Sequence, residues 1–142
     1  MKHLKLFVES AGQPARYTID QMQEMMRGKV IDEIMPSEID KISRVMADSG
    51  LSGTITEYKY THNGKARTRV AEGDRVESIF FGPVIDTQRP AFIDIHKTTD
   101  DWWWVETVMR TSVDVCYLCD GIKQVVDLIR DLAKKHLDNQ GG

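Results

Sequence analysis

The sequence predicts an α+β fold, built from an antiparallel meander sheet of five or six strands with two N-terminal helices and one C-terminal helix. Three observations support this fold class. Residues 17–50 carry two amphipathic helical patterns, residues 51–118 change to the two-residue period of strands, and residues 119–138 return to helical spacing. Two helices, a run of strands and a further helix are typical of α+β proteins, and we expect the helices to pack on one face of the sheet.

The length of 142 residues favours a single domain over residues 1–142. Residues 1–16 form an extension or a first strand ahead of the helical pair. The alternative is a more open sheet, with the N-terminal helical pair as a separate lobe. An apolar fraction of 41% and a charged fraction of 29% are those of a folded globular chain, so disorder is not expected for the body of the chain.

The first two helices have recognisable start and stop residues. Thr18 and Gln21 have the spacing of a capping box, in which each side chain accepts a hydrogen bond from a free backbone N–H group. Pro36 opens the second helix and Gly50 ends it. Because both helices are amphipathic, each must bury one face.

Six segments have strand character: residues 55–60, 65–71, 76–81, 91–97, 102–109 and 113–118. Asn63-Gly64 joins the first two as a tight hairpin, because both central residues of such a turn need positive φ. The C-terminal helix follows the last strand and carries one apolar stripe. Its members are Ile122, Val125, Val126, Ile129, Leu132 and Ala133. This stripe predicts a helix that covers the sheet and belongs to the core.

Cys116 and Cys119 form a C-x-x-C motif, which can be a redox pair or half of a zinc site. Three residues along a strand span about 10 Å, beyond the roughly 7 Å between Cα atoms that a disulfide tolerates. The odd spacing also directs the two thiols to opposite faces of the sheet. No second motif completes a metal site, so we interpret both cysteines as buried structural residues and expect no metal and no cofactor.

Trp102, Trp103 and Trp104 are consecutive on a predicted strand. Alternation places Trp103 on the core face with Val105, and Trp102 and Trp104 on the other face with Glu106. Two indoles near solvent would anchor a protein interface with Glu106 at its rim, or stack on bases or sugars. The alternative is a sheet covered on both faces, in which all three rings are packed.

The first predicted hairpin is basic, with interleaved tyrosines. Its candidate nucleic-acid-binding residues are Tyr58, Lys59, Lys65, Arg67 and Arg69. A basic two-stranded ribbon can lie along a phosphate backbone. Charges on an exposed hairpin also keep a sheet edge soluble without any ligand. The net charge of −3 disfavours nucleic-acid binding through bulk charge, so only a local patch of this kind could support it.

The sequence contains no recognisable catalytic motif. No Ser, His and acid stand in a familiar arrangement, and no glycine-rich loop follows a strand to hold a phosphate. We therefore predict no catalytic residues and favour a protein that is not an enzyme, with an active site assembled from distant residues as the alternative.

No segment approaches the roughly 18 apolar residues of a membrane span. Two cysteines and seven methionines suit a reducing compartment, so we expect a cytoplasmic protein.

Two segments resemble proteins of large tailed bacteriophages related to the T-even group. The opening MKHLKLFVES is similar to the leaders of internal head proteins, in which a prohead protease cuts after a Glu. Lys2, Phe7 and Glu9 stand at the matching positions. Residues 100–132 also look like the ends of small uncharacterised phage proteins. With the aromatic surface, this resemblance implies a non-enzymatic accessory protein, virion component or host-directed, that binds another protein. Nucleic-acid binding through the Lys59–Arg69 hairpin is the alternative.

Overall fold

The computed structural model describes residues 14–51, 58–62, 65–68, 75–82, 92–108 and 114–141. The predicted leader at residues 1–9, the Asn63-Gly64 turn and Arg69 lie outside these residues. The elements in chain order are β1 (Ala15–Tyr17), α1 (Ile19–Met26), β2 (Ile31–Asp32), α2 (Pro36–Asp48), β3 (Tyr58–His62), β4 (Lys65–Arg67), β5 (Ser78–Phe81), β6 (Phe92–Thr98), β7 (Trp102–Val108), β8 (Asp114–Asp120) and α3 (Ile122–Gly141).

The predicted α+β class, with two N-terminal helices and one C-terminal helix, is confirmed. The strands form one antiparallel sheet in the order β1-β8-β7-β6-β5-β3-β4, and β2 pairs with β6. Strands β3 to β8 correspond to the six predicted strands, while β1 and β2 are short additions from the N-terminal region. The sheet departs from a simple meander where β5 pairs with β3, which leaves β4 at the edge.

The first two helices start as their sequences indicate. The Thr18 hydroxyl accepts from the Gln21 N–H at 3.1 Å, and the Gln21 side chain accepts from the Thr18 N–H at 2.9 Å. This confirms the capping box. Pro36 is the first residue of α2, and Glu38 Oε1 accepts from the Met35 N–H at 2.9 Å. The side chains of each first turn therefore satisfy N–H groups that have no partner within the helix.

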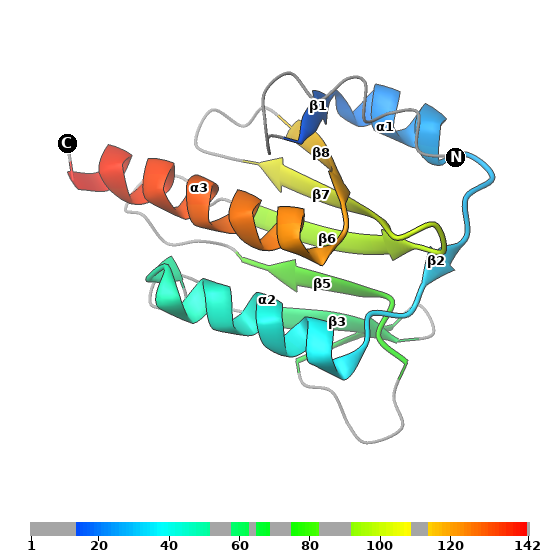
Figure 1. Ribbon diagram of the computed structural model, residues 1–142, viewed down its shortest axis with the longest axis horizontal. Coiled ribbons are helices and arrows are strands. Elements are labelled where there is room, and N and C mark those ends of the chain that lie inside the picture. The colour runs from blue at the N-terminus through cyan, green and yellow to red at the C-terminus, as the bar shows by residue number, and fades with distance from the viewer. Residues whose placement is uncertain are drawn as a thin grey trace.

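The main core lies between one face of the sheet and the helices α2 and α3, which lie side by side across it (Figure 1). Both helices contribute buried apolar side chains, among them Ile42, Met46, Val125 and Ile129. From the sheet, Trp103 is fully buried in the same core. The predicted stripe of the C-terminal helix is thus docked on the strands that precede it.

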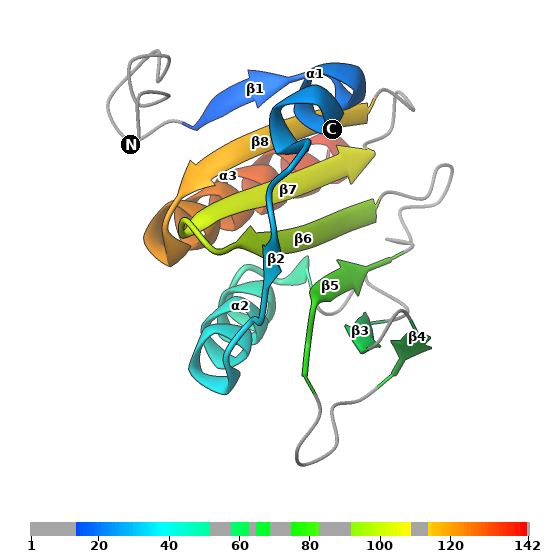
Figure 2. The ribbon, with the colours of Figure 1, turned by 90° about the vertical axis from the view of Figure 1, so that its right-hand side faces the viewer.

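Helix α1 packs on the opposite face of the sheet, at its β1–β8 end (Figure 2). Its Met22 is fully buried against Trp102, Cys116 and Leu118. The expectation that all helices share one face is therefore wrong for α1. Between α1 and α2 the chain passes through β2, which crosses the end of the sheet (Figure 2). This crossing allows two helices that are adjacent in sequence to cover opposite faces.

Candidate functional site

The sheet face that carries α1 also carries a set of polar and aromatic residues from three neighbouring strands. The register pairs Ser78 with His96, His96 with Trp104, and Asp94 with Glu106. Residues directly opposite in an antiparallel pair lie on the same face, with Cβ atoms about 4.5–5.5 Å apart. We call these five residues, Ser78, Asp94, His96, Trp104 and Glu106, the polar face.

Trp104 and His96 form the aromatic centre of the polar face. Their ring centroids are 5.2 Å apart and the ring planes are inclined by 36°. Both side chains are partly exposed, so part of each ring reaches the surface. Phe80 and Phe92 lie on the same face, with their ring centroids 5.5 Å apart. The polar face is therefore bordered by further aromatic surface.

Three buried polar atoms of this face have no hydrogen-bond partner among the described residues. They are Asp94 Oδ1, His96 Nδ1 and Trp104 Nε1. Leaving a buried donor or acceptor unpaired costs about 1–3 kcal/mol, and such groups are uncommon in native proteins. The indole nitrogen can only donate, the carboxylate oxygen accepts when ionised, and the imidazole can do either. A group that satisfied all three would have to both accept and donate.

The environment of Asp94 favours its neutral form. Burial raises the pKa of the Asp94 carboxyl, while the charge of His96 and a hydrogen bond from the Ile95 backbone N–H lower it. The structure thus brings together Ser78, His96 and Asp94, the three residue types of a catalytic triad. However, His96 Nδ1 has no hydrogen-bond partner among the described residues, so they do not form the hydrogen bond to Nδ1 through which the acid of a triad orients the imidazole.

The two flanking tryptophans differ in exposure. Trp102 is only 6% exposed and packs in one cluster with Met22 of α1, so at this position the packed alternative holds and not the exposed indole. Trp104 and Glu106 are partly exposed, and both stay candidates for an interface. Trp103 lies in the main core, on the face opposite to them, as its alternation predicts.

The candidate nucleic-acid-binding hairpin consists of β3 and β4, at one edge of the sheet. Position 59 pairs with Phe80 and therefore lies on the same face as the polar face. Positions 65 and 67 pair with His62 and Tyr60, which lie on the face of the main core, and Lys65 is exposed. The register therefore places position 59 on one face of the sheet and positions 58, 65 and 67 on the other face. Nucleic-acid binding by this hairpin stays a prediction.

The two cysteines are free and fully buried on opposite faces of the sheet. Cys116 packs with the α1 cluster and Cys119 with the main core, which confirms that both are buried and that they lie on opposite faces. Within the described ranges, no three His, Cys, Asp or Glu side chains are grouped so that they could hold a metal ion. None of the helices described is long and apolar enough to cross a membrane.

Comparison with known proteins gives no family model, no curated protein and no solved structure that matches this chain. The argument for function therefore depends on the polar face.

Sequence reasoning missed Asp94 and His96, although the signal was present. Both alternate with Ile93 and Ile95 on a predicted strand, and this period of two places them together on the face opposite to the isoleucines.

Proposed function

We propose that this chain is a non-enzymatic accessory protein, of the phage type that its opening and C-terminal segments resemble, and that it binds another protein through the polar face. The observation that carries the proposal is Trp104. Its ring is partly exposed beside His96, and its buried Nε1 has no partner among the described residues. Tryptophan is among the residues that contribute most binding energy at protein interfaces.

The chemistry of the polar face favours a protein over a nucleic acid. Asp94 and Glu106 place two carboxyl groups on neighbouring strands at the same level of the sheet. A carboxyl group offers no positive charge to the phosphates that nucleic acids present along their whole length, and it repels them where it is ionised. A peptide segment carries no phosphates, and its apolar or aromatic side chains can pack on the exposed parts of the Trp104 and His96 rings.

Partner capture from an infected-cell lysate tests this proposal, with the parent chain compared with Trp104→Ala and Met35→Ala. Met35 is an exposed apolar residue outside the polar face, so it controls for the loss of any surface hydrophobic group. We expect Trp104→Ala to lose the partner and Met35→Ala to retain it. With the purified partner, the loss of affinity should be about 30-fold, as expected for an interface residue worth about 2 kcal/mol. An unchanged set of partners for Trp104→Ala contradicts the role of the polar face.

A further inference from the structure

A groove of about 330 Å³ lies between α2 and α3, on the side of the sheet opposite to the polar face. Its size falls within the range of about 300–1,000 Å³ that is common for ligand sites. Both helices contribute charged side chains to its walls: Lys41, Arg44, Asp48, Lys123, Asp127 and Arg130. The walls are thus built by two segments about 80 residues apart in the sequence, which the fold brings side by side (Figure 1).

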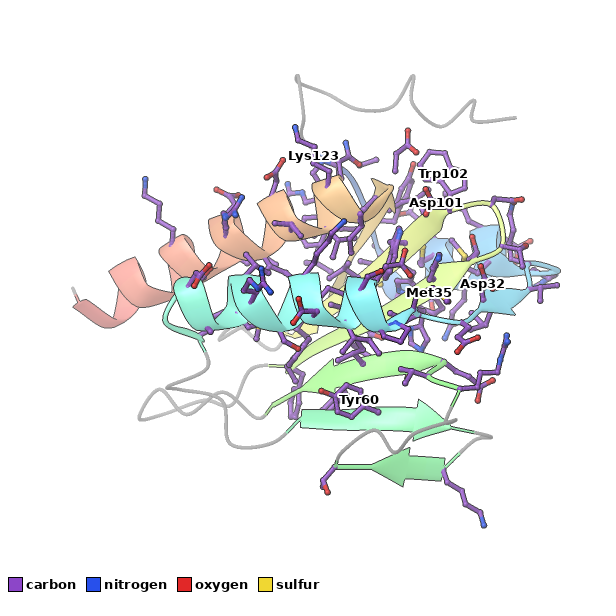
Figure 3. All side chains as sticks on the ribbon, turned by 60° about the horizontal axis from the view of Figure 1, so that its bottom comes forward. Asp32, Met35, Tyr60, Asp101, Trp102 and Lys123 are labelled. Carbon is purple, nitrogen blue, oxygen red and sulfur yellow. The ribbon has the colours of Figure 1, made fainter. Side chains whose placement is uncertain are left out.

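Helical spacing explains why these side chains meet. Lys41, Arg44 and Asp48 are three and four residues apart on α2, so they share one face of the helix. Lys123, in the first turn of α3 (Figure 3), is followed at the same spacing by Asp127 and Arg130. The apolar residues that line the groove are Val45, Ile122 and Val126; they are buried or partly buried, whereas the charged lining residues are exposed, so they form its floor. The groove therefore combines charged walls with an apolar floor.

The walls are positively charged in a protein whose net charge is −3. Four basic residues face two acidic ones. Arg44 pairs with Asp40 at 2.8 Å and Arg130 with Asp127 at 3.4 Å, so two of the four cations already have an anionic neighbour. Lys41 and Lys123 are exposed and form no ion pair with any residue in the described part of the chain. They are the positive charges still available to a ligand.

We infer that the α2–α3 groove docks an acidic segment of a partner protein, with apolar side chains of that segment on the groove floor. Charge complementarity selects the acidic residues, and the apolar floor selects a segment that also carries residues such as Leu. A nucleic acid would meet the lysines but leave the floor unfilled. This docking surface is separate from the polar face, so it stands whether or not the proposed function does. The protein would then have one interaction surface on each side of the sheet.

The test uses a fluorescein-labelled 12-residue peptide of alternating Glu and Leu as the probe, measured by anisotropy against the full chain. We expect saturable binding that weakens as salt is raised. Changing Lys41→Glu and Lys123→Glu together should reduce the affinity by about tenfold or more, because a like charge is placed against the probe. Arg27→Glu is the control, since Arg27 is exposed at the end of α1, on the other side of the sheet, and does not line the groove, so this variant should bind like the parent.

Two further probes separate the alternatives. A Glu/Ser peptide of the same length and charge should bind at least about tenfold more weakly, because it has nothing to place on the apolar floor. A labelled single-stranded DNA oligomer should bind more weakly than the Glu/Leu peptide. Equal binding of the Glu/Ser peptide, tighter binding of DNA, or an unchanged affinity of the Lys41→Glu/Lys123→Glu variant overturns the inference. Trp104→Ala should bind the probe like the parent, so the outcome is independent of the polar face.

Discussion

The ammonium group of Lys97 lies 3.0 Å and 3.1 Å from the two carboxylate oxygens of Glu38, and so joins β6 to the first turn of α2. The two side chains are only 12% and 16% exposed. Lys97 Nζ also lies 5.6 Å from the ring centroid of Trp103, a distance at which a cation and an aromatic ring attract each other. This ion pair fixes the start of a core helix against a central strand.

Lys97→Met should destabilise the protein by about 3 kcal/mol, because it leaves the largely buried Glu38 carboxylate without its main cation. Methionine retains an apolar chain over Trp103, so the loss reports on the charge. Urea denaturation of Lys97→Met, Glu38→Gln and the double variant measures the coupling. We expect the double variant to lose clearly less stability than the two single losses added together. Strict additivity would show that the two side chains do not interact.

Asp94→Asn should change the pH dependence of stability. Burial raises the pKa of the Asp94 carboxyl above its unfolded value of about 3.9, with smaller lowering by His96 and Ile95. The folded state therefore holds this proton more tightly than the unfolded state. The resulting stability is fully present below the unfolded pKa and is lost as pH rises through the folded pKa.

We expect Asp94→Asn to remove this decline, and so to be at least as stable as the parent at pH 7. Urea midpoints measured from pH 3.5 to pH 8 test the expectation, with Asp48→Asn as the control for an exposed carboxylate. A parent-like decline in Asp94→Asn would mean that another group is responsible. A gain in stability would also indicate that the Asp94 carboxyl destabilises the folded protein, as is common for residues that serve binding.

The cysteines should be inert in the folded protein. Cys116 and Cys119 are fully buried, and burial strongly raises the pKa of the Cys119 thiol, so little reactive thiolate is present. Labelling with Ellman's reagent at pH 8 should be slow in buffer, and both thiols should react quickly in concentrated urea. Rapid labelling of one thiol in the folded protein would contradict the burial of that residue.

The sequence predicts best those features that depend on local spacing. The Thr18–Gln21 capping box, the opposite faces of Cys116 and Cys119 and the core position of Trp103 all follow from helical or strand periodicity, and the structure has each of them. In each case the residues that decide the outcome are neighbours along the chain. Periodicity then determines which side chains share a face, with no knowledge of the tertiary fold.

Features that depend on distant segments could not be predicted in this way. An amphipathic helix shows that it buries one face, but not against which side of the sheet, so the sequence left open whether a helix covers Trp102, as α1 does with Met22. The α2–α3 groove was missed for the same reason, because Lys41 and Lys123 each belong to an ordinary charged helix face until the helices pack together. The polar face could be predicted only in part. Strand alternation places Asp94 and His96 on one face, but their position beside Trp104 depends on which strands are neighbours in the sheet.

Helix α3 should contribute a large part of the total stability, because its apolar stripe is buried in the main core. Ile129 is fully buried there, and truncating a packed isoleucine to alanine costs about 2–5 kcal/mol, including the cavity. That is a large fraction of the roughly 5–15 kcal/mol of an ordinary domain. Lys123→Ala, at an exposed position of the same helix, should change stability by less than about 0.5 kcal/mol. Urea denaturation of both variants measures the difference, and an Ile129→Ala variant as stable as the parent would show that α3 is not docked through this residue.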